Sequence, residues 1–406
     1  MSVTRFAVIW GVLLAFALPA VEAHATPWVV SGAVVRGDFD NDGNLETVAS
    51  SPQSEGTRGV VHVVDGAAGT ATRWTRATSG LAGGGAAVGD YFGAALAVGD
   101  FDGDGFDDLL VSAPGADDAG PSDSGVLHVI YGSSGGLTTV GDQVFHQNTT
   151  GIGGVAEAND QLGDVLTVGD FNCDTYDDVV IGVPMESISS HAAAGAVHVL
   201  YGSSAGVTAV DDLYYQSLGG VNGLAEAGDH FGGGLATGNF NGDSDSGNAC
   251  DDLAIGVPDE AIGAIASAGY VYTLLGGTSG LSTTGDIAFH QNVSGVSDVS
   301  ESGDRFGLRM FTGDEDGDGY DDLAVVSPGD SCISGHGEAH HVFLGTSSGL
   351  TVTGNHIQCA SYRCMIDEDT NVYACHSYSP PVYASDSADT IAMFVGNDVV
   401  YAGGRR

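Results

Sequence analysis

Five acidic loops recur along this chain, and their side chains could hold a hard divalent cation. The second loop reads Asp-Phe-Asp-Gly-Asp-Gly-Phe-Asp-Asp from Asp100 to Asp108, with carboxylates at positions 1, 3, 5 and 9. Ca²⁺ takes six to eight oxygen ligands at flexible geometry, so these carboxylates and the backbone carbonyl at position 7 suit it. Glycine at position 6 permits the tight bend that such a loop needs around an ion.

The other four loops keep this register with substitutions. They run over Asp38–Glu46, Asp170–Asp178, Asn239–Asp252 and Asp314–Asp322, and the fourth carries an insertion at Ser244–Cys250. Ligand charge and loop fit rank the expected affinities with the second and fifth loops highest, then the first, third and fourth. Up to five Ca²⁺ ions are predicted, on the ligands Asp38, Asp40, Asp42, Asn44, Glu46, Asp100, Asp102, Asp104, Phe106, Asp108, Asp170, Asn172, Asp174, Tyr176, Asp178, Asn239, Asn241, Asp243, Asp252, Asp314, Asp316, Asp318, Tyr320 and Asp322.

A solvated acidic turn without metal is the alternative for any one loop, but five loops in one register favour metal binding. An EF-hand would need Glu at position 12, where this chain has Val111 in the second loop and Val325 in the fifth. We therefore expect the loops to join strands rather than helices, and the ions to stabilise the fold rather than to catalyse a reaction.

The same loops mark a repeat. They begin at residues 38, 100, 170, 239 and 314, which are 62, 70, 69 and 75 residues apart. Each unit adds an aromatic-Gly turn such as Tyr91-Phe92-Gly93, an apolar run ending in proline such as Leu109–Pro114, and a glycine that opens an alternating strand such as Gly125–Tyr131. These short β-branched runs predict about four strands per unit and no helix after the first residues. Such units bury their faces by packing radially around an axis, which predicts an all-β fold of the β-propeller type.

The aromatic-Gly turn, the acidic loop and the apolar-Pro run together resemble the FG-GAP repeat over about residues 27–355. The resemblance implies the propeller of integrin α chains and of bacterial exported proteins. The first unit lacks a clear Phe-Gly, and no acidic loop follows His356. Residues 24–406 hold between five and six units of the observed length, so we expect six blades, with seven, the integrin number, as the alternative. The expected blades cover about 27–88, 89–157, 158–227, 228–302 and 303–355, with a degenerate closing blade at 356–406.

Charge narrows the classes of partner. The formal net charge is −43, and the chain has no lysine. Nucleic-acid binding needs clustered cations, so the sequence argues against nucleic acid and against anionic membrane surfaces. Residues 1–23 have the pattern of a cleaved secretory signal peptide, with Arg5, the apolar run Phe6–Leu18 and small residues before the cut after Ala23. No later segment has the ~20 apolar residues of a membrane span. We expect a secreted, cell-surface or periplasmic protein.

The six cysteines are an even number for an oxidising compartment. Cys173 lies in the third acidic loop and Cys250 in the fourth, so a disulfide could staple these loops if consecutive units stack. The remaining four could form two further bridges of unknown connectivity, at Cys332, Cys359, Cys364 and Cys375. Zinc is disfavoured because the Cys359–Cys364 pair has no second close pair.

Several familiar motifs fit the repeat better than their usual roles. Gly-x-Ser-x-Gly occurs at the same place in successive units, at Gly132–Gly136, Gly202–Gly206 and Gly345–Gly349, which favours hairpin turns over the nucleophile elbow of a hydrolase. Arg36-Gly37-Asp38 spells an adhesive tripeptide, but Asp38 is position 1 of the first acidic loop. Histidines share one strand position, which favours packing or hydrogen bonding over catalysis: His62, His128, His198 and His341.

The sequence therefore predicts a calcium-stabilised binding or adhesion module with an extracellular protein or glycan as ligand, and no enzyme activity. A hydrolase or phospholipase-associated propeller and a scaffold in an envelope complex are the alternatives. The expected ligand-binding loops are the variable segments Asp117–Ser124, Glu186–Ala194, Asp259–Ser267 and Ser331–Gly337.

Overall fold

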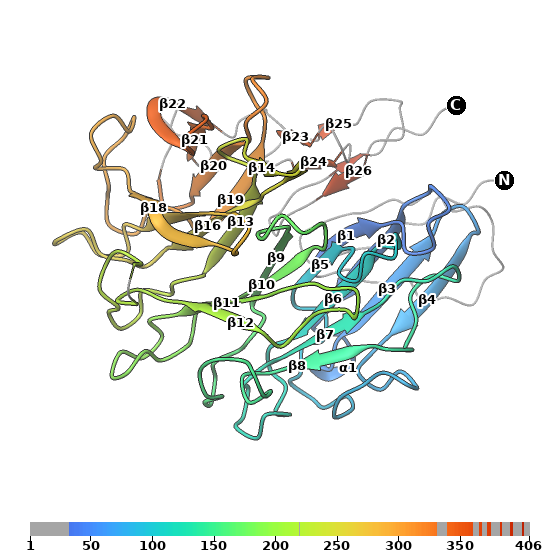
Figure 1. Ribbon diagram of the computed structural model, residues 1–406. Helices are drawn as coiled ribbons and strands as arrows, with labels where there is room; N and C mark the ends of the chain where they lie inside the picture. Colours follow the sequence, from blue (N-terminus) through green and yellow to red (C-terminus); the bar gives the residue numbers. More distant parts are fainter. Residues whose placement is uncertain are drawn as a thin grey trace.

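Four-stranded antiparallel sheets make up nearly all of the described fold (Figure 1). The computed structural model describes residues 32–330 apart from Gly219, residues 339–359, and short strands within residues 365–401. The predicted signal peptide and the fourth predicted ligand-binding segment, Ser331–Gly337, lie outside the described residues. No helix in the described part of the chain is long and apolar enough to cross a membrane.

Five sheets follow one another along the described chain, each with neighbouring strands in chain order. The first sheet comprises β1 Val34–Gly37, β2 Glu46–Ser51, β3 Val60–Asp65 and β4 Thr70–Trp74; the second, β5 Leu96–Gly99, β6 Asp108–Ala113, β7 Val126–Ile130 and β8 Gln143–Phe145; the third, β9 Val165–Gly169, β10 Asp178–Val183, β11 Ala196–Leu200 and β12 Asp211–Tyr214; the fourth, β13 Gly234–Gly238, β16 Asp252–Val257, β17 Tyr270–Leu275 and β18 Ser282–Phe289; the fifth, β19 Arg309–Gly313, β20 Asp322–Ser327, β21 Ala339–Leu344 and β22 Thr351–Cys359.

The remaining elements are small. A hairpin of β14 Ser244–Asp245 and β15 Asn248–Ala249 occupies the insertion in the fourth acidic loop. The turn α1, Ser54–Thr57, is not a regular helix, because Glu55 and Gly56 have φ of 54° and 69°. Beyond Cys359, the described strands pair as a three-stranded sheet and a two-stranded sheet, formed by β23 Met365–Asp367, β24 Val372–Ala374 and β26 Thr390–Ala392, and by β25 Val382–Tyr383 and β27 Val400–Tyr401.

The sheets are arranged like the blades of a propeller. Their first strands contact one another in succession, β1 with β5, β5 with β9, β9 with β13, and β13 with β19, and the sheets fan out from these strands (Figure 1). The apolar cores lie between neighbouring sheets: one joins Val48 and Val61 of the first sheet to Leu109 and Val111 of the second. The all-β, propeller-like fold is confirmed, and the number of blades remains a prediction.

One boundary differs from the expectation. The fifth unit was expected to end at residue 355, but β22 pairs with β21 as far as the Ala339–Cys359 partners. The fifth sheet therefore takes four more residues, because its fourth strand is longer than the corresponding strands of the first three sheets.

The aromatic-Gly turn docks each sheet onto the one before. Gly195, at the start of β11, has φ of +87°, and a Cβ there would lie 2.3 Å from the carbonyl oxygen of Phe231 in the next unit. Phe231 N–H donates to the Ala194 carbonyl oxygen at 2.8 Å. Glycine is required at this position because both the left-handed backbone and the close approach of a neighbouring chain segment exclude a side chain.

Candidate calcium-binding loops

The acidic loops join the first and second strands of each sheet, as expected. In the second loop, Asp100 accepts hydrogen bonds from the N–H groups of Gly103 at 2.8 Å and Gly105 at 3.0 Å. Asp102 accepts from Asp104 N–H at 3.1 Å. The position-1 carboxylate therefore organises the turn from inside, and the fifth loop repeats this pattern around Asp314.

The structure gathers three carboxylates in the three loops that ranked highest. One oxygen from each member lies within 4.8 Å of the others in Asp38–Asp40–Asp42, in Asp100–Asp102–Asp108 and in Asp314–Asp316–Asp322. A related set in the first loop joins Asp40 and Glu46 to Asp65 of β3. These are oxygen-only ligand sets of the kind that Ca²⁺ prefers. The backbone carbonyls predicted at Asn44, Phe106, Tyr176 and Tyr320 follow in the same turns, and their part in coordination remains a prediction.

The third and fourth loops are weaker sets. Asn172 replaces a carboxylate in the third, where it accepts from Asp174 N–H at 3.0 Å. In the fourth, Asn239 donates to the Asp243 carbonyl oxygen at 2.9 Å, so one predicted ligand is engaged within the loop. Within the described residues, neither loop assembles three acidic, histidine or cysteine ligands.

The position-9 aspartate has the same structural role in the second to fifth sheets. Asp108 accepts from Phe101 N–H at 2.9 Å and from Gly132 N–H at 2.8 Å, so it ties the acidic loop to the turn after β7. Asp178, Asp252 and Asp322 make the equivalent pairs of bonds. Burial raises the pKa of Asp108 and Asp178 to about 8. A nearby cation would favour the charged forms of both carboxylates.

Position 8 makes a contact between neighbouring loops that sequence reasoning missed. Asp177 Oδ2 accepts a hydrogen bond of 2.8 Å from Asp100 N–H, so the third loop holds the second. Asp251 holds Asp170 N–H in the same way at 2.9 Å. Burial raises the pKa of both Asp177 and Asp251 to about 6, and the donated N–H partly offsets this. The recurrence of paired aspartates at positions 8 and 9 was the available signal. We call this contact the loop latch.

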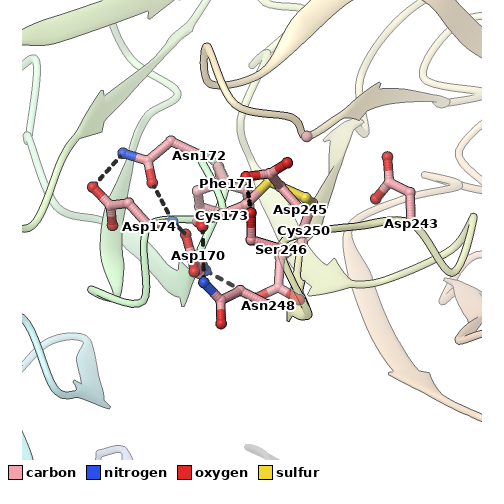
Figure 2. The surroundings of a disulfide bond; sticks show 12 residues. Asp170, Phe171, Asn172, Cys173, Asp174, Asp243, Asp245, Ser246, Asn248 and Cys250 are labelled. Carbon is pink, nitrogen blue, oxygen red and sulfur yellow. Dashed lines mark hydrogen bonds between the residues drawn. A yellow bond between two sulfur atoms is a disulfide. The ribbon is translucent and has the colours of Figure 1, made fainter.

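A disulfide adds a covalent link between the third and fourth loops. Cys173 and Cys250 are bonded, as the sequence suggested, across a separation of 77 residues. The inserted hairpin carries Cys250 toward the third loop, and Asn248 Nδ2 donates to the Cys173 carbonyl oxygen at 3.4 Å (Figure 2). The side chains of Cys332, Cys359, Cys364 and Cys375 lie outside the described part of the structure.

The familiar motifs form turns, strands and buried positions of the fold. Gly132–Gly136 is the turn between β7 and β8, where Ser133 Oγ donates to the Gly136 carbonyl oxygen at 2.7 Å. Arg36 lies on β1 and donates to the Leu45 carbonyl oxygen, and Asp38 accepts from two N–H groups of its own loop. The shared histidine position is buried at His128, His198 and His341, as packing or hydrogen bonding requires.

Comparison with known proteins agrees with the repeat. Residues 92–130 and 162–200 match the FG-GAP repeat. Phosphatidylinositol-glycan-specific phospholipase D of Rattus norvegicus is 31% identical over 170 residues, which cover 41% of this chain and 18% of that protein. Integrin alpha-PS2 of Drosophila melanogaster is 31% identical over 179 residues, 43% of this chain and 12% of that protein. The chain thus spans less than a fifth of the length of these relatives. The structure of a rhamnogalacturonan lyase from Bacillus licheniformis matches over 79% of this chain and 50% of the lyase chain, with 13% sequence identity and a TM-score of 0.40.

Proposed function

We propose that this chain, which contains FG-GAP repeats, is a secreted, calcium-stabilised binding module that recognises an extracellular protein. The observation that carries this proposal is an exposed apolar side chain at the same loop position in three successive units. These side chains are Val155, Leu224 and Val299, with exposed fractions of 66%, 71% and 61%. Each is followed two residues later by an exposed glutamate. We call the three the apolar row.

The apolar row lies at the end of the sheets opposite the acidic loops. In a four-stranded meander, the connections between strands 1 and 2 share one end with those between strands 3 and 4. The connections between strands 2 and 3 and those leading to the next sheet share the other end. Here the two kinds of connection bond to each other: Asn148 Nδ2 donates to the Ala119 carbonyl oxygen at 2.9 Å, and Asn159 N–H to that of Ser122 at 2.9 Å. The first three predicted ligand-binding segments, which lie among the described residues, and the apolar row thus belong to one face.

The composition of this face favours a protein ligand. An exposed apolar residue beside a carboxylate suits a partner that combines apolar anchors with basic groups. The net charge of −43 acts in the same direction, because it would attract a basic partner and repel an acidic one. A glycan reached through bridging calcium is the weaker alternative.

Calcium is proposed as a structural ion that holds the loops at the far end. Extracellular sites bind Ca²⁺ with dissociation constants of about 10⁻⁴–10⁻³ M. At about 1 mM Ca²⁺ and a dissociation constant of ~10⁻⁴ M, one site stabilises the folded state by about 1.4 kcal/mol. A melting temperature that rises with Ca²⁺ and falls with EDTA is expected. An unchanged melting temperature would count against the calcium role and leave the binding face to be tested separately.

The binding proposal is tested by serine substitution of the apolar row. A panel of secreted proteins and a glycan array are screened with the mature chain in millimolar Ca²⁺. Any protein bound by the wild type should bind the V155S/L224S/V299S variant at least about tenfold more weakly, since buried apolar anchors dominate interface energy. The matched control is V140S/V210S, because Val140 and Val210 are also exposed but lie in turns between the third and fourth strands. Absence of any protein ligand, or equal loss in both variants, would contradict the proposal.

A further inference from the structure

Buried polar clusters lie at the junctions between neighbouring sheets, on the face that carries the apolar row. At the junction of the third and fourth sheets, Gln216 Nε2 donates to Glu260 Oε2 at 2.8 Å and to Tyr272 Oη at 3.2 Å. At the previous junction, Gln147 Nε2 donates to Glu186 Oε2 at 2.5 Å. Each cluster takes its amide from the chain after the fourth strand and its acid from the turn after the next sheet's second strand.

At the first junction, an arginine side chain supplies a positive charge. Arg76 stands two residues after the end of β4, where Gln147 stands two residues after β8. Its guanidinium bonds Asp118 at 2.6 Å, Asp90 at 2.7 Å and the Nε2 atom of His128 at 3.2 Å. Arg76 is only 3% exposed. The junction can therefore enclose a positive charge between two carboxylates and a histidine nitrogen.

The junction of the fourth and fifth sheets has similar acceptors without the guanidinium. Gln291 takes the place of Arg76, and its Nε2 lies 3.2 Å from Asp330 Oδ2 and 3.4 Å from His341 Nε2. His341 is fully buried and corresponds to His128, and its Nε2 is 3.8 Å from Asp330 Oδ2. Asp298 completes the group, with ligand atoms of Asp298, Asp330 and His341 all within 4.8 Å of one another.

Asp298 distinguishes this junction from the two before it. The corresponding loop positions are Gly154 and Gly223. A Cβ added at Gly223 would lie 2.4 Å from Tyr272 Oη and 3.0 Å from Gln216 Nε2, so the position faces the cluster. The fifth sheet's junction thus gains a second carboxylate at a place where the neighbouring repeats have no side chain.

A buried oxygen nearby is also without a partner. Gln291 is 1% exposed, and its Oε1 makes no hydrogen bond, while its Nε2 meets both Asp330 and His341. Gln147 and Gln216 share this unpartnered Oε1, but of the three only Gln291 has two carboxylates and a histidine gathered beside it. The two ends of an amide have the same shape, and rotating this one would turn the oxygen toward the cluster. A buried acceptor without a donor is costly, and a cation in the cluster would satisfy it.

We propose that Asp298, Asp330 and His341 bind one divalent transition-metal ion, Zn²⁺ by preference. The ion would take the place that the Arg76 guanidinium has in the first junction. One imidazole nitrogen and two carboxylates with a further open position form a zinc ligand set. The amide oxygen of Gln291 or water completes the coordination. Ca²⁺ prefers sites of oxygen alone, so this site is chemically separate from the acidic loops. The inference does not depend on the proposed binding function.

Co²⁺ is the probe for this site, because its visible absorption reports nitrogen ligation and four-coordinate geometry. The untagged mature chain is titrated with Co²⁺ in millimolar Ca²⁺, which keeps the acidic loops occupied. One Co²⁺ per chain, displaced by Zn²⁺, is expected. The Asp298→Gly and His341→Tyr variants each recreate a residue found at the corresponding position of the preceding repeat, so both should fold. Each should lower Co²⁺ affinity at least about tenfold, since even partners outside the ligand sphere change it about 10–100-fold.

His198→Tyr is the matched control, because it makes the same change at the corresponding position of the third sheet and should leave Co²⁺ affinity unchanged. Circular dichroism establishes that each variant is folded, and Asp298→Gly alone decides the question if His341→Tyr is not. The proposal is overturned if the wild type shows no Co²⁺ absorption in excess Ca²⁺, or if Asp298→Gly binds Co²⁺ as tightly as the wild type. Equal loss in His198→Tyr would also overturn it.

Discussion

Replacing Cys173 and Cys250 by alanine should destabilise the chain at the junction where calcium can help least. The disulfide joins the third and fourth acidic loops, which have three and two carboxylates at the predicted ligand positions, against four in the second and fifth. Fewer carboxylates mean weaker calcium binding. The disulfide therefore joins the two loops for which we expect the weakest calcium binding.

The size of the effect follows from the length of chain that the bond closes. For a separation of 77 residues, the chain-entropy model gives about 4.5 kcal/mol at 25 °C, and measured losses start at about 2 kcal/mol. Other contacts would survive the substitution, including the backbone bond from Asp251 N–H to the Asp170 carbonyl oxygen at 2.9 Å. The folded state should therefore keep its geometry, and the loss should come from the freed unfolded chain.

The assay is urea unfolding followed by circular dichroism, in Ca²⁺ and in EDTA. Because a repeat array can unfold in parts, hydrogen exchange is measured alongside to locate the loss. The third and fourth sheets should lose protection first, and the loss should be larger in EDTA. Treating the double variant with a thiol reductant controls for the other four cysteines.

One result would refute this reasoning. The wild-type disulfide is first verified by mass spectrometry of the unreduced chain. A change of less than about 0.5 kcal/mol in both conditions, which is the range of a neutral surface substitution, would show that the disulfide adds nothing to the latch and the packed core. Equal loss of protection in the first sheet would show that the effect is not local.

Three further changes test other parts of the fold. Asp177→Ala removes the loop latch and leaves the partly buried Asp100 N–H without its charged acceptor, so urea unfolding should show a loss of about 1–3 kcal/mol; no loss would contradict the latch. Burial raises the pKa of Glu186 to about 7, so stability present below its unfolded pKa is lost as the pH rises toward 7. Glu186→Gln should therefore stabilise the chain by up to about 3 kcal/mol at pH 8 and not at pH 4, and a gain independent of pH would be the wrong outcome. Gly195→Ala places a Cβ 2.3 Å from the Phe231 carbonyl oxygen, so the melting temperature should fall by several degrees, and a neutral result would exclude that close approach.

The repeat and its strands could be predicted because their signals are local and recur five times. Turn glycines, the proline after each second strand and the acidic loop fix where each strand begins and ends. The Cys173–Cys250 bond could be suggested for a related reason, since both cysteines lie at corresponding loops of consecutive units. The end of β22 at Cys359 was missed because no turn residue marks it.

Contacts between units could not be predicted from the sequence pattern. Asp177 meets Asp100 N–H across 77 residues, and Arg76 meets His128 across 52. Both depend on how far one sheet is rotated relative to the next, and no periodicity in the chain encodes that rotation. The junction clusters and the loop latch therefore emerge only when the sheets are placed side by side.

The loop latch has a direction along the chain. In all four cases among the described sheets, a later loop accepts from the position-1 N–H of the loop before it: Asp107 from Asp38, Asp177 from Asp100, Asp251 from Asp170 and Asp321 from Asn239. During synthesis, a repeat that has just emerged from the ribosome consequently lacks the contact that finishes its own acidic loop. We therefore expect each loop to be completed only after the next repeat has folded against it. A chain truncated between the second and third units should therefore bind Ca²⁺ more weakly at the second loop than the full chain does.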